Sequence, residues 1–571
     1  MSDNLLFHEF PPVSSEEWRK KIEVDLKGVD FEKKLVWKTE EGFAVQPYYR
    51  QEDLESLSVN TTPGQFPFVR GNESELNHWQ IIQQIDSSSL EEANKRAVEA
   101  VERGAQGLSF RINDVDNAED LAFLLKNIDL TETAVHFHSA NTYSILADLL
   151  RKEFARQNID AAKVNGSFNF DSFGYYLQNG DFYNSHDDNM NELVCLFDLM
   201  KKDLSNFKLI NINGQHFANA GAHAAQELAF SLASAVEYIN QLTEKDCKVE
   251  DILPRMRMSL SIGPSYFMEI AKFRAVRLLW ANIAKQYTQD ENLQKIIVHG
   301  VSSLYNKTVY DLYNNMLRNT TEAMSAAIGG VDEITVLPHD FVLGDSGEFG
   351  DRIARNVQLM LKEESHFDKV ADPSAGSYYI ETLTKELAEQ AWAEFLKVEE
   401  KGGFLKAMTE GYLKTEIEAT VAKRQKLIAS RRKVYVGINN YPNLTEEFPA
   451  DANYPKSKTA EGNALNMHRG AESFEDLRYR TDAHVKAGNK RPVAMMLQFG
   501  HLAMRNARAM FSSNFLGVGG YKVESLICDN PADVQSIMKE HNPAIVVLCS
   551  SDDEYLEIGM QYLEDVKEAG R

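Results

Sequence analysis

Short, β-rich apolar runs alternate with helical segments through the middle of this 571-residue chain, and this alternation restricts the fold more than any other feature. Most runs are followed by apolar residues at helical spacing. Strands that alternate with helices imply a parallel sheet, because each parallel step needs a long crossover. Eight such units in roughly 280 residues predict an α/β fold, a (β/α)₈ TIM barrel rather than an open sheet. The predicted strands are 108–112, 134–137, 167–170, 208–212, 256–262, 295–299, 333–337 and 378–380.

A second α/β region is predicted after the barrel. Residues 438–470 are rich in Asn, Pro, Lys and Gly, which is typical of a linker or a wrapped loop. Three strands are predicted beyond it, at 493–497, 522–527 and 544–548. A flavodoxin-like sheet usually has about five strands, so we expect this last domain to be incomplete where the sequence stops, at Arg571. The expected domains are an N-terminal arm at 1–60, the barrel at 61–400, a helical segment and linker at 401–485, and a degenerate domain at 486–571.

The net charge and the cysteines indicate which binding partners to exclude and in which cellular compartment the protein works. The chain has 85 acidic and 61 basic residues and a formal net charge of −24, so its surface repels the phosphates of nucleic acids and anionic membranes. It has no apolar run near the ~20 residues of a membrane helix and no signal-peptide core near its start. Its four cysteines are far apart, which indicates free thiols in a reducing compartment. We expect a cytoplasmic protein without nucleic-acid or membrane partners.

Histidines near the predicted strand ends are the first candidates for chemistry. His136 and His138 are two residues apart on a strand, so both rings lie on one face. With His216 and His299 they could form a metal-dependent hydrolase site, but no acidic ligand is evident. We therefore expect no metal, and interpret the pair as hydrogen-bonded histidines of a half-buried strand. His216, directly after a strand, could instead act as a general acid or as a hydrogen-bond donor.

One tetrapeptide resembles a protease nucleophile loop. Residues 344–347 read Gly-Asp-Ser-Gly, as in chymotrypsin-like enzymes. Those enzymes are all-β, and it is the geometry of a triad that makes a nucleophile. We interpret the motif as a turn.

Several longer segments, in order along the chain, resemble the methylmalonyl-CoA mutase family. The resemblance covers about residues 35–435 and is weaker from 491 onward. It implies a barrel of the acyl-CoA mutase type followed by a cobalamin-binding-type domain. The matching segments are 35–37, 103–109, 213–222, 264–272, 313–315, 322–324, 352–356 and 372–378.

The chain departs from the family in the cobalamin-type domain. Family members carry Asp-x-His-x-x-Gly, in which the His becomes the lower cobalt ligand and the Asp orients its ring. Here His501 remains, but Phe499 stands at the Asp position and Met504 at the Gly position. We therefore expect no cobalamin on this chain, and do not expect His501 to bind cobalt.

The substrate pocket departs from the family as well. Ile82 and Gln84 fall where catalytic chains have an Arg and a Tyr that contact the substrate. His216 and Arg255 look like retained pocket positions. We expect His216, Arg255 and Gln84 to form a vestigial pocket without catalytic residues.

The resemblance implies the small, non-catalytic subunit of a heterodimeric methylmalonyl-CoA mutase, which interconverts succinyl-CoA and methylmalonyl-CoA. A larger homologous subunit would bind adenosylcobalamin and the acyl-CoA substrates, and this chain would stabilise it. Two alternatives stay open. One is an active cobalamin-dependent acyl-CoA mutase of altered specificity that uses His501, and the other is a scaffold for a partner that is not a mutase.

Overall fold

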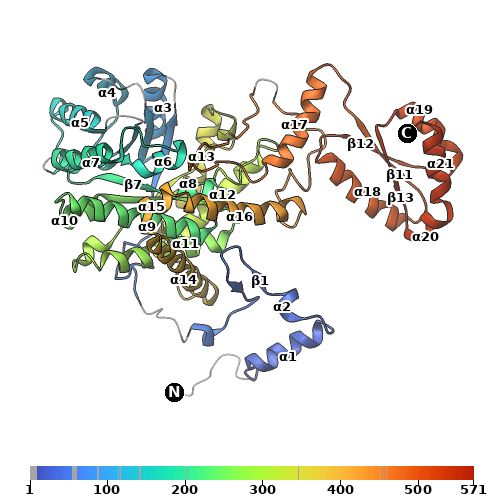
Figure 1. Ribbon diagram of the computed structural model, residues 1–571, viewed down its shortest axis with the longest axis horizontal. Coiled ribbons are helices and arrows are strands. Elements are labelled where there is room, and N and C mark those ends of the chain that lie inside the picture. Colours follow the sequence, from blue (N-terminus) through green and yellow to red (C-terminus); the bar gives the residue numbers. More distant parts are fainter. Residues whose placement is uncertain are drawn as a thin grey trace.

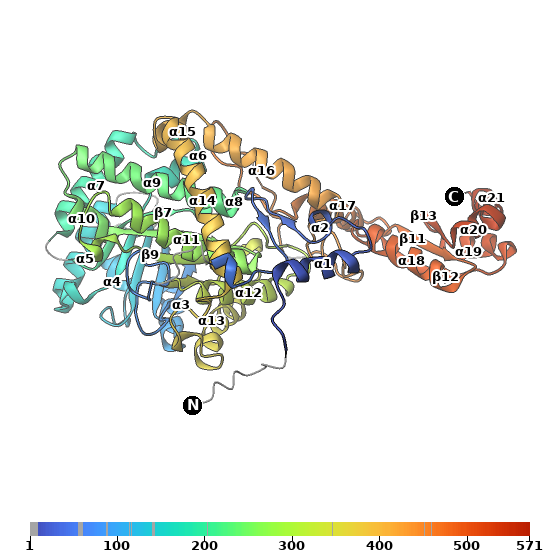
Figure 2. The same cartoon turned by 90° about the horizontal axis from the view of Figure 1, so that it is seen from below.

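A barrel, a linker region and a small α/β domain follow one another in the computed structural model, and a helical arm precedes them (Figure 1). The structure describes residues 10–570 except 55–60, 87–88, 113–114, 116, 140–142, 202–203, 345, 450–451 and 458. The last domain extends away from the barrel beyond the linker region in both ribbon views (Figures 1 and 2). No described helix combines the length and the apolar character needed to cross a membrane.

The barrel prediction is confirmed. Eight parallel strands close in the order β10-β3-β4-β5-β6-β7-β8-β9, and the pairing of Ile334 with Ile81 joins the last strand to the first. The strands are β3 (Gln80–Asp86), β4 (Gly107–Ile112), β5 (Ala134–Ser139), β6 (Gly166–Phe170), β7 (Phe207–Asn213), β8 (Met256–Ile262), β9 (Ile297–Ser302) and β10 (Glu333–Thr335).

One predicted strand is wrong and one strand was missed. Residues 378–380 begin a helix, α14 (Tyr378–Glu400), because the Ser377 side chain accepts a hydrogen bond from the Ile380 backbone and caps its first turn. The true first strand is β3, which the prediction overlooked. Every strand of the barrel is therefore one place later than the sequence order predicted.

Helices surround the barrel on its outside. The longest of those that lie between the strands, α9 (Ala224–Glu244), is mostly buried, and its first turn carries a capping box formed by His223 and Gln226. The other helices between the strands, with one after the last, are α3 (Leu90–Glu102), α4 (Ala118–Leu124), α5 (Tyr143–Gln157), α6 (Ser172–Asn179), α7 (His186–Met200), α8 (Gln215–Asn219), α10 (Val249–Ile252), α11 (Tyr266–Ala284), α12 (Asn314–Ile328) and α13 (Glu348–Glu363).

The region after α14 crosses the carboxyl end of the barrel. It contains α15 (Phe404–Thr409), α16 (Tyr412–Ala429) and α17 (Glu472–Lys486). Three backbone hydrogen bonds bind the linker before α17 to the barrel: Leu465 donates to Leu177 of α6, His468 to Asn219 of α8, and Gly470 to Tyr305 in the loop after β9. The linker therefore lies against the segments that follow β6, β7 and β9.

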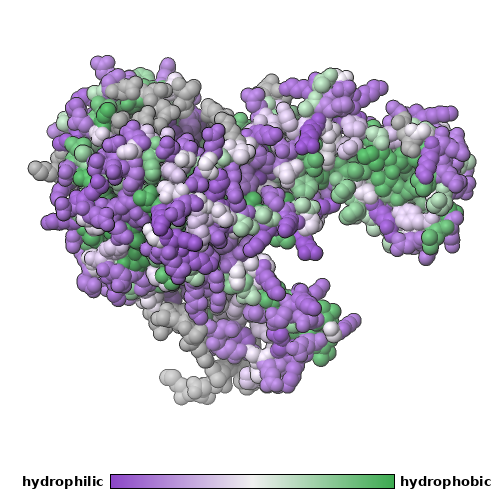
Figure 3. Space-filling view, in the orientation of Figure 1, coloured by the Kyte–Doolittle hydropathy of each residue, from purple (hydrophilic) through white to green (hydrophobic). Residues whose placement is uncertain are grey.

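The last domain has a three-stranded parallel sheet of order β12-β11-β13, formed by β12 (Lys522–Ile527), β11 (Val493–Gln498) and β13 (Ile545–Cys549). The helices α18 (Leu502–Gly517), α19 (Val534–His541) and α21 (Met560–Glu568) pack on it. All four cysteines are free thiols. Figure 3 shows apolar side chains gathered over this domain, and Met510 and Phe511 of α18 are 71% and 65% exposed. This domain leaves more apolar surface uncovered than the side of the barrel visible in the same view.

The N-terminal arm stands away from the barrel (Figure 1). Its helix α1 (Ser15–Asp25) has no buried residue. After α2 (Phe31–Lys34), the short hairpin of β1 (Trp37–Lys38) and β2 (Ala44–Val45) returns to the main body. Residues 1–9 and 55–60 of the predicted arm lie outside the described residues.

Candidate functional site at the mouth of the barrel

A cavity of about 350 Å³ lies at the carboxyl end of the barrel strands, the face that carries the active site in TIM-barrel enzymes. Arg111 from β4, Gln178 from α6 and His216 from α8 line its barrel side. The linker supplies further wall residues, among them Met467, His468 and Arg469. The cavity is therefore formed by both the barrel and the linker.

His216 lies in this cavity as a neutral hydrogen-bonding group. The Nε2 atom of Gln178 is 3.0 Å from Nε2 of His216. An amide nitrogen can only donate, so His216 accepts at Nε2 and carries its proton on Nδ1. Burial, with a smaller contribution from the charge of Arg111, lowers the pKa of His216 to about 4. At neutral pH this ring can donate a hydrogen bond from Nδ1.

Gln84 lies on β3 next to the mouth. Its amide donates to the Asp86 carboxylate, and an Asp86 oxygen is 3.8 Å from Nε of Arg111. Gln84 is thereby linked to the cavity that contains His216, through Asp86 and Arg111.

Arg255 lies at the other end of the barrel. It precedes β8, and its guanidinium donates to the carbonyl oxygens of Phe207 at 2.8 Å, Met200 at 3.1 Å and Leu204. The structure does not bring Arg255 together with His216. Its contacts instead tie α7 and β7 to the start of β8.

The other predicted histidines are neutral members of a polar network between strands. Nδ1 of His136 is 2.9 Å from Ser167 Oγ, and Nε2 of His138 is 3.1 Å from Ser109 Oγ. His299 contacts hydroxyls of β8 and β10 at 3.0 and 2.8 Å. Burial, followed by nearby positive charges, lowers the pKa of all three histidines well below the ordinary value. The described residues include no group of three or more His, Cys, Asp or Glu suited to a metal.

Arg257, which the sequence analysis missed, crosses the same interior. Its side chain is 2% exposed and pairs with the Glu333 carboxylate. It also donates to Asn169 Oδ1 at 2.8 Å and to Ser167 Oγ at 3.3 Å. A single charged residue inside a strand of apolar and small residues was the signal that could have identified it.

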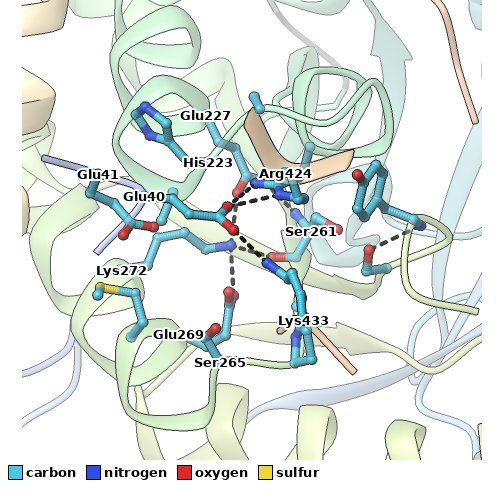
Figure 4. Close-up of a pocket in the computed structure, with 18 of the residues that line it drawn as sticks. Glu40, Glu41, His223, Glu227, Ser261, Ser265, Glu269, Lys272, Arg424 and Lys433 are labelled. Carbon is cyan, nitrogen blue, oxygen red and sulfur yellow. Dashed lines mark hydrogen bonds and ion pairs between the residues drawn. The ribbon is translucent and has the colours of Figure 1, made fainter. Parts of the chain in front are cut away.

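A second, smaller cavity of about 80 Å³ lies between the hairpin of the arm, α9, α11 and α16 (Figure 4). Glu40 contacts Arg424 at 2.6 Å and Lys433 at 2.7 Å. Lys272 contacts Glu227 at 2.7 Å and Glu269 at 2.6 Å. The charged groups pair with one another, so this site fastens the arm and the helices together.

The Gly-Asp-Ser-Gly turn shows no nucleophile geometry in its described part. Ser346 is buried, and its Oγ has no hydrogen-bond partner among the described residues. Asp345 lies outside them.

In the last domain, His501 precedes α18, and its backbone N–H donates to both carboxylate oxygens of Glu554, at 2.8 and 3.0 Å. Phe499 points into the core and stacks on Tyr562. A cobalt-binding His needs a polar partner that orients its ring, and the Phe499 position offers only an aromatic ring. These residues do not fit a cobalt-coordinating site of the family's pattern.

Comparisons with known proteins agree with this architecture. The methylmalonyl-CoA mutase family model matches residues 38–114 and 113–486. The chain is 44% identical to a Porphyromonas gingivalis protein named methylmalonyl-CoA mutase small subunit, over 97% of this chain and 90% of that protein. A small subunit from Streptomyces virginiae is 31% identical, with 98% and 92% covered. A Cereibacter sphaeroides protein named methylmalonyl-CoA mutase is 33% identical, with 76% and 65% covered. The chain belongs to the methylmalonyl-CoA mutase family.

Proposed function

We propose that this chain is the small, non-catalytic subunit of a heterodimeric, adenosylcobalamin-dependent methylmalonyl-CoA mutase. The observation that carries the proposal is the replacement of the orienting Asp by Phe499, whose ring is part of the domain core. The near full-length similarity to proteins named as small subunits supports the same assignment.

The mouth of the barrel supports a non-catalytic role. His216 is neutral and hydrogen-bonded to Gln178. Arg255, which the family resemblance assigned to the pocket, binds three backbone carbonyls at the opposite end. The barrel interior is occupied by the network around Arg257. These contacts maintain the frame of the barrel.

The proposed partner is a larger homologous mutase chain that binds adenosylcobalamin and the acyl-CoA substrates. This chain would contribute an obligate-type interface, which commonly buries more than about 2,000 Å². Its role is to stabilise the catalytic subunit, with succinyl-CoA and methylmalonyl-CoA interconverted on the partner.

Co-expression with a homologous chain that has the intact Asp-x-His-x-x-Gly motif tests this proposal. We expect a 1:1 complex by size-exclusion chromatography with light scattering. Visible absorption should show adenosylcobalamin on the partner and the complex but not on this chain alone. His501→Ala in this chain should leave the cobalamin content of the complex unchanged. Stoichiometric cobalamin and mutase turnover on the isolated chain would refute the assignment.

A further inference from the structure

We propose that α18 and the linker segment 441–444 form a docking surface for the catalytic partner, which covers it with an apolar segment flanked by carboxylates. The inference rests on the proposed function, because it assigns a surface to the partner proposed there. The docking surface is separate from the barrel mouth, since it belongs to the last domain and to the part of the linker beside that domain.

A groove of about 460 Å³ lies between α18 and the linker. Tyr441, Pro442 and Leu444 line its linker side, and Ala509 and Met510 of α18 lie opposite. The other lining residues are Gln498, Asn506, Ser513, Asn514 and Ser525. None of the described residues that line the groove is charged. The groove therefore suits apolar side chains of an occupant and not its charged groups.

The two walls of the groove are fixed to each other. The backbone N–H of Tyr441 donates to Asn514 Oδ1 at 3.2 Å, and Asn514 Nδ2 donates to Asn440 Oδ1 at 2.7 Å. These hydrogen bonds join the linker to α18 directly. The groove is thus formed before any occupant arrives, which lowers the entropic cost of binding.

An exposed apolar patch on α18 extends the groove. Met510, Phe511 and Phe515 are 71%, 65% and 59% exposed, and Tyr441 on the linker is 67% exposed. The rings of Phe511 and Phe515 stack, with centroids 6.3 Å apart and planes 11° from parallel. Single exposed apolar side chains are common, but a contiguous group of large ones marks an interaction site. Met, Phe and Tyr are also the types enriched at protein–protein interfaces.

Charge restricts what can cover this patch. The chain has a net charge of −24, yet the segments 419–445 and 483–523, which include the linker side and α18, contain no Asp or Glu. Arg431 of the first segment lies over the ring of Phe511, 5.7 Å from its centroid. In a symmetric contact, a second copy of this chain would place the same positive charge opposite itself, which costs energy. An apolar segment flanked by carboxylates complements both the patch and its charge.

The apolar part of the surface is tested with Met510→Ser combined with Phe511→Ser. Both side chains are exposed, so the fold should be unchanged, and circular dichroism checks it. We expect the dissociation constant of the complex with the catalytic homologue to rise at least about tenfold, measured by sedimentation over a dilution series of labelled complex. The matched control, Phe349→Ser with Met360→Ser, removes the same residue types from exposed positions of α13 and should leave the constant unchanged.

The charged part is tested with Arg431→Gln. The glutamine amide can still donate to Asn440, as the arginine does at 2.7 Å, but the positive charge is gone. We expect affinity to fall about three- to tenfold at low salt, and the difference to shrink at high salt. Arg352→Gln is the control, because Arg352 lies over the ring of Phe349 on α13, 6.0 Å from its centroid. It should have no effect at either salt concentration.

A photo-crosslinking variant, Phe511→p-benzoylphenylalanine, identifies the occupant. Mass spectrometry should find a peptide of the catalytic chain with apolar residues beside Asp or Glu. Four results would overturn the docking surface and leave the subunit assignment intact: unchanged affinity in the α18 variant, equal weakening in the α13 control, crosslinks to a second copy of this chain, or phosphatidylserine vesicles that displace the partner. If the unmodified chains form no complex, the subunit assignment itself fails, and the docking surface with it.

Discussion

Phe499 lies face to face against Tyr562, with ring centroids 4.1 Å apart and planes 10° from parallel. Both side chains are fully buried, and the Tyr562 hydroxyl donates to the Cys528 carbonyl oxygen at 2.6 Å. The pair joins the end of β11 to α21. At the position where the family pattern has an Asp, this chain therefore has a Phe that packs in the core. The same substitution removes the group that would orient the His and stabilises the domain.

Restoring the carboxylate should therefore damage the domain without creating a cobalamin site. Phe499→Asp removes the stacked ring and buries a charge, so we expect a loss of at least about 3–5 kcal/mol in the free energy of unfolding. Urea unfolding followed by near-UV circular dichroism measures it. Phe515→Asp changes a ring that is 59% exposed and should alter stability by less than about 0.5 kcal/mol. A stable Phe499→Asp protein that binds cobalamin would contradict this account.

Arg257 should be essential to the stability of the barrel. Arg257→Met leaves the Glu333 carboxylate without its partner, and breaking a buried pair costs about 3–5 kcal/mol. As a control, Lys152→Met removes an exposed pair with Asp148 and should cost less than about 1 kcal/mol. Thermal unfolding of both variants decides the question. Equal stability would show that the buried network does not hold the strands together.

The barrel could be predicted from the sequence because most of its strands are apolar. The prediction missed β3, which is not. Four of the seven residues of β3, Gln-Ile-Ile-Gln-Gln-Ile-Asp, are polar. Gln83 is nevertheless buried, where it accepts a hydrogen bond from Arg355. Conversely, Tyr378 and Tyr379 favour a strand by residue type, but the capping side chain of Ser377 sets a helix.

The residues of the cavity at the barrel mouth were predicted only where local sequence determines their position. His216 follows a strand directly, so its place at the mouth could be deduced from local sequence. The linker side of the cavity could not be deduced in this way. His468 belongs to a linker without hydrophobic periodicity, and it reaches the cavity only through long-range contacts with Asn219 and its neighbours. Arg255 and Arg257 are two residues apart, yet one lies at the amino end of a strand and the other in the barrel interior.

Acid should destabilise the protein through His216. Its pKa is about 4 when folded and 6.5 ordinarily, so between these values the unfolded chain binds a proton that the folded chain does not. The free energy of unfolding therefore falls as the pH drops from 6.5 toward 4. Since the ring is partly accessible, we expect this residue to contribute about 1–2 kcal/mol.

His216→Gln retains a polar side chain but cannot titrate, so its stability should fall less between pH 7 and pH 5. Urea unfolding at pH 7, 6 and 5 for both proteins isolates this residue from the other buried histidines. Parallel pH profiles would show that His216 does not contribute.

Glu40 should fasten the arm to the body of the protein through charge (Figure 4). Burial raises the pKa of its carboxyl, but Arg424 and Lys433 outweigh this effect and hold the pKa at about 2. Since the ordinary value is 4.5, the stabilisation is fully present above pH 4.5 and is lost as the pH falls toward 2. At pH 7, Glu40→Gln should cost about 1–2 kcal/mol, a value reduced by partial exposure.

The loss of stability in Glu40→Gln should be local, because the Glu40 ion pairs join the hairpin of β1 and β2 to α16 and to the segment after it. We expect faster hydrogen exchange of the hairpin amides in this variant. Glu41→Gln is the matched control: the change is chemically the same at the next residue, and burial raises the pKa of Glu41. It should leave exchange in the hairpin unchanged. Equal acceleration in both variants would mean that hairpin packing, and not the Glu40 ion pairs, fastens the arm.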